Sequence, residues 1–180
     1  MPILPGLVNC HHCKVTLFLL YICLILWYNI AKTKMVNLLK KIQLETKKQF
    51  ESVDITFHVQ KAVLESGIKN GMALVFCPHT TAAIRLNHNE PLLFQDIMKT
   101  LYRLVPVDTS YSHDLFEVRQ NVAANERSNG HAHVKTFLFG SSETLPIEKG
   151  ELVKGPRQSV FFVEFDGARN RQVLIKILGE

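Results

Sequence analysis

The feature that most constrains the fold is a short apolar run, residues 72–77, that ends abruptly in a polar cluster. A run of this length between turn residues is typical of a fully buried strand, and Pro78 cannot donate a hydrogen bond to a neighbouring strand. We therefore predict a buried strand that stops before Pro78, with residues 79–90 as a polar loop. His79 would then lie at a rigid strand end, where it can face a cleft. The alternative is a hydrogen-bonded packing histidine.

The rest of the chain from residue 35 alternates between strand-like and helix-like patterns. Apolar residues at helical spacing, with starting signals at Asp54 and Pro91, predict two main helices. The long polar stretch 108–129 is predicted to be a functional loop. Further strands are predicted at residues 37–46, 132–139, 159–165 and 172–178, with a hairpin around 146–155. The order predicts a single compact α+β domain with a mixed or antiparallel sheet.

The two predicted helices should each turn an apolar face inward. Residues 55–66 are expected to bury Phe57, Val59, Val63 and Leu64, and Gly67 should end that helix. The second helix is expected to face the core with Leu93, Ile97, Met98, Leu101 and Leu104.

Charge is nearly balanced once the first residues are set aside. Three of the 21 basic residues, Lys14, Lys32 and Lys34, precede residue 35, whereas all 16 acidic residues follow it, so the remaining chain carries +2. A nucleic-acid surface would need a clustered basic stripe, which is absent from this pattern. A pocket for an anionic small molecule remains compatible, because a few arginines suffice.

Residues 1–34 differ in character from residues 35–180 and form a predicted N-terminal extension. Residues 15–31 are uncharged and strongly apolar, at the short limit for a membrane-spanning helix. Lysines after this segment outnumber Lys14 before it, so a signal anchor would leave the domain in the cytoplasm. The alternative is that Met35 is the working start. Cys77, the single cysteine of the domain, suits a reducing compartment.

Two features could carry chemistry. His131 and His133 open a predicted strand, where side chains two apart share a face and can converge on one metal, completed by His113 or His79. The alternative is a surface histidine pair. Glu164 lies in a strand that is apolar on both faces, where an unpaired carboxylate would be costly. Arg169 and Arg171 are its nearest candidate partners, either as a buried bridge or as phosphate ligands.

Several separated motifs resemble the YjbQ-like family, whose members are often called secondary thiamine-phosphate synthases. The resemblance covers about residues 35–180. The motifs that carry it are His79-Thr80-Thr81-Ala82-Ala83-Ile84, Asn89-Glu90 before Pro91, Tyr111-x-His113, Asn129-x-x-Ala132-His133, Gly140-Ser141-Ser142, Pro146-x-x-x-Gly150 and Glu164-Phe165-Asp166-Gly167-x-Arg169-x-Arg171.

The resemblance implies an α+β homotrimer with a divalent metal, expected to be zinc, and a weak ability to make thiamine phosphate from phosphorylated precursors. Catalytic roles are expected for His79, His113 and Glu164, and metal ligation for His113, His131 and His133, although many members have an acidic residue at position 131. Substrate or phosphate contacts are expected for Thr80, Thr81, Asn87, Glu90, Asp166, Arg169 and Arg171.

Three departures from the family pattern affect the expected activity. Residues 155–158 read Gly-Pro-Arg-Gln where Gly-Thr-Trp-Gln is common, His88 replaces a frequent acidic residue, and Ala168 replaces a proline. Three hypotheses follow. The chain is a metal-assisted transferase or hydrolase of a phosphorylated small molecule, a non-catalytic trimeric metal-binding protein, or a scaffold tethered to a membrane through residues 15–31.

Overall fold

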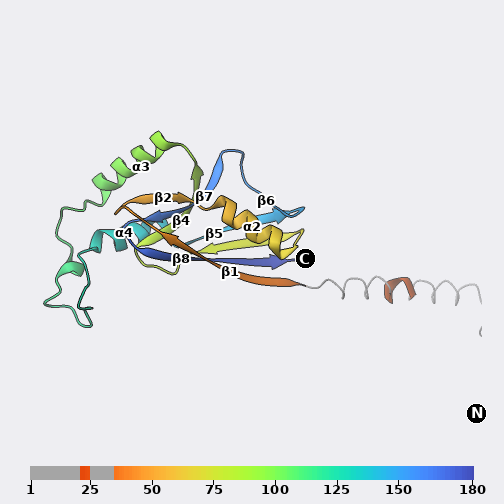
Figure 1. The fold of residues 1–180 in the computed structure, drawn as a ribbon, viewed down its shortest axis with the longest axis horizontal. Coiled ribbons are helices and arrows are strands. Elements are labelled where there is room, and N and C mark those ends of the chain that lie inside the picture. Colours follow the sequence, from red (N-terminus) through yellow and green to blue (C-terminus); the bar gives the residue numbers. More distant parts are fainter. Residues whose placement is uncertain (1–20, 25–34) are drawn as a thin grey trace, which may run out of the picture. The chain divides into compact units, whose positions relative to one another are not determined.

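Two antiparallel sheets form the body of the computed structural model, which describes residues 21–24 and 35–180 (Figure 1). Residues 36–179 form one compact unit. The first sheet has the strand order β1 (Val36–Glu45), β8 (Asn170–Gly179), β3 (Gly71–Phe76), β5 (Ser142–Glu148) and β6 (Glu151–Leu152). The second has the order β2 (Glu51–Asp54), β7 (Gln158–Glu164) and β4 (Ala82–His88). All of these pairs are antiparallel, so the α+β class is confirmed and the sheets are not mixed.

Helix α2 (Thr56–Ser66) begins and ends where its sequence predicts. The Asp54 carboxylate accepts a hydrogen bond from the Thr56 N–H at 2.9 Å, and Gly67 ends the helix with a φ of 71°. Val59 and Val63 are buried as expected. Phe57 and Leu64 were also predicted to be buried. This prediction was wrong, because both lie on the exposed side of the helix.

The second sheet separates two apolar cores. The larger core is enclosed by one face of this sheet, by the inner face of the first sheet and by α2. Its other face packs against helices α3 (Pro91–Leu104) and α4 (Gly130–Phe139). Strand β7 contributes to both cores, with Val160 and Phe162 in one and Phe161 and Val163 in the other. The prediction that both of its faces are buried is confirmed.

Helix α4 replaces the strand that we predicted for residues 132–139. Its buried side consists of His131, Ala132, Lys135 and Thr136, which recur at helical spacing. Because three of these residues are polar, a search for apolar periodicity does not find the helix. The Asp114 carboxylate accepts hydrogen bonds from the first N–H groups of the helix, which satisfies donors that otherwise lack partners.

Helix α3 is less buried than its apolar spacing predicts. Leu101 is buried, whereas Leu104 is 68% exposed. Pro91 occupies the first turn, as expected, and the Glu90 carboxylate accepts hydrogen bonds from the Leu92 and Leu93 N–H groups.

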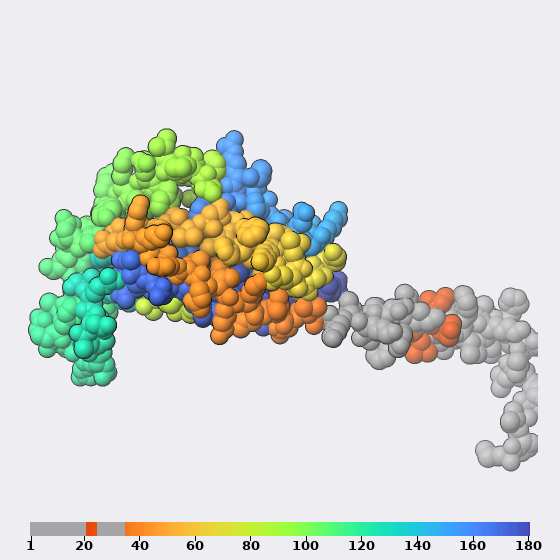
Figure 2. All heavy atoms as spheres, in the orientation of Figure 1, coloured from red at the N-terminus to blue at the C-terminus, as the bar shows by residue number. Residues whose placement is uncertain are grey.

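Strand β4 corrects the prediction that residues 79–90 form a loop. The loop covers only residues 77–81, and β4 then pairs with β7 along its whole length. The short strand β2 was also not predicted. A hairpin forms near residues 146–155, but Pro146 lies inside β5 rather than in the turn. The predicted long loop is present with one short helical turn, η1 (Ser112–Asp114), and it projects from the sheets (Figure 2).

The predicted membrane segment, residues 15–31, falls almost entirely outside the described residues. Of that segment the structure describes only a helical turn at residues 21–24. Among the described helices, none has both the length and the apolar character needed to cross a bilayer.

Candidate functional site

Glu164 and Arg171 are neighbours because successive side chains of a strand point to opposite faces, and both of these point into the space between the two sheets. In β7, Glu164 continues the inward row of Val160 and Phe162, and in β8, Arg171 continues the inward row of Val173. The two side chains therefore meet between the sheets, at one end of the larger core. Both are buried, with Glu164 fully enclosed.

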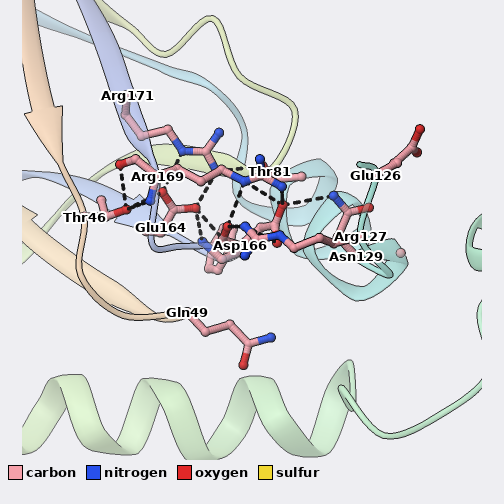
Figure 3. A network of polar contacts seen from close by, with 12 residues as sticks. Thr46, Gln49, Thr81, Glu126, Arg127, Asn129, Glu164, Asp166, Arg169 and Arg171 are labelled. Atoms are coloured by element: carbon pink, nitrogen blue, oxygen red, sulfur yellow. Dashed lines mark hydrogen bonds and ion pairs between the residues drawn. The ribbon is translucent and has the colours of Figure 1, made fainter. Parts of the chain in front are cut away.

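Four side chains form what we call the Glu164 cluster: Glu164, Arg171, Thr46 and Thr81 (Figure 3). Arg171 donates through Nε and one terminal nitrogen to the two carboxylate oxygens of Glu164, each at 2.6 Å. The hydroxyl of Thr46 donates to Glu164, and Thr81 accepts from Arg171. The structure thus shows the buried bridge, one of the two alternatives that the sequence left open.

A second group, the Asp166 cluster, lies just beyond β7 (Figure 3). It consists of Asp166, Arg169, Arg127 and Asn129. Arg169 donates to the Asp166 carboxylate through Nε at 3.1 Å and a terminal nitrogen at 2.7 Å. Asn129 donates to the same carboxylate at 3.0 Å, and Arg127 donates to the Asp166 carbonyl at 2.8 Å. Arg169 is therefore a partner of Asp166 and not of Glu164.

The third feature is an open cavity of about 650 Å³ that we call the histidine pocket. It lies where the loop between β3 and β4 approaches helix α4. The lining residues are Phe76, Cys77, Pro78, His79, Thr80, His133, Thr136, Phe137, Gly140 and Ser141. Two histidines that are far apart in the sequence thus share one cavity.

His79 is held in place by strand β8. Its Nε2 accepts a hydrogen bond from the Gln172 N–H at 2.9 Å, so the neutral ring carries its proton on Nδ1. Burial, and then the nearby Arg171 guanidinium, lower the pKa of His79 below its ordinary value. The neutral imidazole is therefore the dominant form at pH 7.

His113 and His133 lie side by side, with ring centroids 4.4 Å apart. The Nε2 atom of His113 is buried and has no hydrogen-bond partner among the described residues. The Glu126 carboxylate lies 3.8 Å from that atom, and Glu126 is itself bound by Arg119. Burial, followed by the proximity of His113, lowers the pKa of His133. Imidazole nitrogens coordinate metal ions, so these two side chains are suited to bind one.

His131 does not join this pair, contrary to the prediction of a shared strand face. In an α-helix, side chains two positions apart point in nearly opposite directions. His131 is buried, with Nε2 3.4 Å from Gln49 and Nδ1 3.4 Å from the Lys135 ammonium. Within residues 21–24 and 35–180, no three His, Cys, Asp or Glu side chains converge closely enough to hold a metal ion.

The other predicted site residues are distributed over several environments. Thr80 lines the histidine pocket, whereas Thr81 is buried in the Glu164 cluster. Asn87 is exposed on β4, where its side chain accepts the His88 N–H. Glu90 is used as the cap of α3. The structure therefore brings His79, Thr80 and His133 together, and places Asn87 and Glu90 elsewhere.

Sequence reasoning missed Lys135, the most deeply buried cation of the described residues. Its ammonium donates to the Val105 carbonyl at 2.7 Å and lies 5.2 Å from the centroid of the Phe50 ring. Burial lowers its pKa to about 8. Lys135 follows His131 by four positions, so a helical interpretation of residues 130–139 would have placed both on one face.

Arg127 was also missed, because it lies in the long polar loop and outside every recognised motif. Asn129 was named only as part of a motif. Its side-chain oxygen is buried without a hydrogen-bond partner among the described residues.

Comparison with known proteins decides the family. A model described as "UPF0047 protein YjbQ-like" matches residues 40–180. A UPF0047 protein of Methanocaldococcus jannaschii is 37% identical over 146 residues, which cover 81% of this chain and 97% of that protein. The chain belongs to the YjbQ-like UPF0047 family. The UPF0047 protein YugU of Bacillus subtilis is 36% identical over 143 residues, covering 79% of this chain and all of YugU.

Solved structures of the family have the same fold. A protein of Sulfolobus solfataricus, described as YbjQ-like and of unknown function, has a TM-score of 0.74 at 37% identity, and covers 82% of this chain and 100% of its own. A YjbQ/UPF0047 protein of Clostridium acetobutylicum has a TM-score of 0.68 at 42% identity, and covers 77% of this chain and 98% of its own. The resemblance inferred from the motifs is therefore confirmed.

Proposed function

We propose that this member of the YjbQ-like UPF0047 family is a metal-assisted transferase or hydrolase that acts on a phosphorylated small molecule. Formation of thiamine phosphate from a pyrimidine pyrophosphate and a thiazole phosphate is one reaction of this class. The observation that carries the proposal is the histidine pocket, where two imidazoles with lowered pKa values, those of His79 and His133, line a cavity of about 650 Å³.

His79 is suited to donate a hydrogen bond to a substrate. Its Nε2 is occupied by the Gln172 N–H, which leaves the Nδ1–H as the free polar group of the neutral ring. Protonation of Nε2 would place two N–H groups face to face, so the neutral form is favoured by geometry as well as by burial. His79 can therefore orient an oxygen of the substrate without itself adding a charge.

A divalent cation, with zinc as the proposed identity, would be held by His113 and His133. The unpartnered buried Nε2 of His113 fits this role, and imidazole is a common zinc ligand. A cation there would supply charge neutralisation for a leaving phosphate or pyrophosphate. Two imidazoles are too few for a stable site, so the remaining ligands would come from substrate, solvent or a second subunit.

We also propose a homotrimer, which the family resemblance implies. Helix α4 supports it, because Val134, Phe137 and Leu138 form an exposed apolar stripe, with Phe137 89% exposed. Phe137 and Phe76 both line the histidine pocket, and both are exposed at its edge. A neighbouring subunit against this surface would reduce the access of water to the pocket.

The test uses the full chain and measures bound metal and turnover together. The protein is purified, its metal content per subunit is determined, and it is incubated with the pyrimidine pyrophosphate and thiazole phosphate, then with a panel of phosphorylated small molecules. Release of pyrophosphate or phosphate is followed. His133→Ala should lose bound metal and turnover, because it removes one of the two facing imidazoles.

His58→Ala is the matched control, since His58 is exposed on α2, away from the pocket. It should keep metal and turnover at the level of the unmodified chain. Full activity in His133→Ala would refute the proposed site.

The second candidate is a non-catalytic trimeric metal-binding protein. Two observations favour it. The first is that Glu164, for which the family resemblance implies a catalytic role, makes a buried bridge with Arg171. The second is the loop of residues 155–158, where Arg157 stands in place of the tryptophan that is common in the family. Metal bound at His113 and His133 without turnover of any substrate in the panel would support this candidate.

A further inference from the structure

We propose that Arg127 and Arg169 form an anion site around Asp166 that takes a phosphoryl or pyrophosphoryl group. This inference deepens the proposed function and rests on it for the identity of the ligand as part of a substrate. It also assigns a role to Arg127, which no motif contains, and removes Arg171 from the predicted phosphate contacts.

The two guanidinium groups are brought close together by one backbone oxygen. Arg127 donates to the Asp166 carbonyl at 2.8 Å, and Arg169 donates to the same oxygen through Nε at 3.0 Å. The two donating nitrogens therefore lie no more than about 6 Å apart. Such a separation allows two guanidinium groups to contact the oxygens of one phosphate or of adjacent phosphates.

Both arginines remain accessible and incompletely used. The side chain of Arg127 is 48% exposed and that of Arg169 is 37% exposed, whereas Asp166 is buried between them. Among the described residues, hydrogen bonds engage one terminal nitrogen of Arg127, and Nε and one terminal nitrogen of Arg169. Each guanidinium group therefore keeps unused N–H donors for a ligand.

The charge of this cluster also favours an anion. One carboxylate, Asp166, is shared by two cations, so the cluster carries one positive charge that its own members do not balance. Of the neighbouring acids, Glu164 is neutralised by Arg171, and the Asp114 carboxylate is directed at the N–H groups at the start of α4. An added anion would relieve the repulsion between the two guanidinium groups.

Arg171 is unsuited to this role. It is 6% exposed, and its Nε and one terminal nitrogen are committed to Glu164 and Thr81. Moving it toward a ligand would leave the Glu164 carboxylate buried and unpaired, which is costly.

The inference is tested with inorganic pyrophosphate as the probe. The full chain is titrated calorimetrically in the presence of EDTA, so that a bound metal cannot capture the pyrophosphate. Arg127→Ala should weaken binding by about tenfold or more, because a charge-assisted contact is lost. The pyrophosphate affinity of Arg127→Lys should lie between those of Arg127→Ala and the unmodified chain, since lysine keeps the charge and lacks the planar fork.

Arg103→Ala is the control for the loss of one surface guanidinium, because Arg103 is exposed on α3 and makes no ion pair within the described part of the chain. It should bind pyrophosphate as the unmodified chain does. Arg127 is preferred to Arg169 as the site of mutation, since the Arg169 side chain makes three hydrogen bonds to Asp166 and its loss would leave that buried carboxylate with fewer partners.

Equal affinity in Arg127→Ala and the unmodified chain would overturn the inference, as would the lack of pyrophosphate binding at millimolar concentration. The two proposals fail separately, because binding is measured without turnover. Arg127-dependent binding in a protein that turns over no substrate would refute the enzyme and leave the anion site standing. Turnover that needs His133, together with binding that ignores Arg127, would refute only the anion site.

Discussion

At the scale of single residues, burial separates structural charges from chemically available ones. Glu164 and Arg171 satisfy each other inside the molecule, together with Thr46 and Thr81. Within the described part of the chain, Nε2 of His113 has no hydrogen-bond partner, His133 lies beside it, and His79 uses Nε2 to accept the Gln172 N–H. Residues that share one sequence motif, such as Arg169 and Arg171, can therefore have different roles. Arg171 lies in β8 and points into the space between the sheets, whereas Arg169 precedes the strand and binds Asp166.

Glu164→Gln should lower the free energy of unfolding by about 3–5 kcal/mol, because it leaves the Arg171 charge buried without a counter-ion. The measurement is urea denaturation at pH 7. Glu143→Gln is the matched control, since its partner Arg85 is 39% exposed, and exposed pairs contribute about 1 kcal/mol or less.

Replacing both members, with Glu164→Leu and Arg171→Met, should recover most of the loss, because an apolar pair removes the desolvation penalty of both charges. A similar small loss in Glu164→Gln and Glu143→Gln would show that the Glu164 cluster is not a major source of stability.

At the scale of elements, helix α4 has polar residues on its buried side and apolar residues on its exposed side. His131, Lys135 and Thr136 are buried, while Phe137 and Leu138 are exposed. This reversal explains why the sequence predicts a strand here, since the pattern His-Ala-His-Val alternates. Asp114 and the polar partners of the buried side stabilise the helix in place of an apolar stripe.

Asp114→Ala should lower the free energy of unfolding by about 1–2 kcal/mol, because the first N–H groups of α4 lose their acceptor. Asp114→Asn should cost less, since an amide oxygen still accepts a hydrogen bond. Chemical denaturation gives both values. Asp96→Ala on α3 is the control, because the Asp96 side chain is 72% exposed. Equal stability of Asp114→Ala and Asp96→Ala would contradict the assigned capping role.

At the scale of the whole molecule, one sheet serves two cores. Strand β7 runs through the middle of the second sheet, so its end delivers Glu164 to the space between the sheets and Asp166 to the region around α4. The exposed apolar stripe on α4 borders the histidine pocket. The proposed trimer would cover that stripe and complete the environment of the site.

Phe137→Asp should convert the proposed trimer into smaller species, because it places a charge in an apolar interface. Light scattering coupled to gel filtration of the full chain gives the mass. Phe57→Asp is the control, since Phe57 is 73% exposed on α2, away from α4, and its replacement should leave the trimer intact. A trimeric Phe137→Asp variant, or a monomeric unmodified chain, would refute this interface.

Local sequence patterns were enough to predict the α+β class, the family, the approximate limits of α2 and α3, and the burial of both faces of β7. Each of these depends on local spacing, on capping residues or on motif identity. The sequence also identified Glu164 as a residue that needs a partner, because a carboxylate between apolar neighbours is costly wherever it lies.

Three outcomes required the folded structure: the partner of Glu164, the helical state of residues 130–139, and the separation of His131 from His113 and His133. These outcomes depend on contacts between distant segments. Asp114 stabilises the start of α4 from 15 residues upstream, and Arg171 faces Glu164 because two strands of different sheets point into one space. Periodicity along the chain carries no information about such pairs, since it records only which residues are buried together within one element.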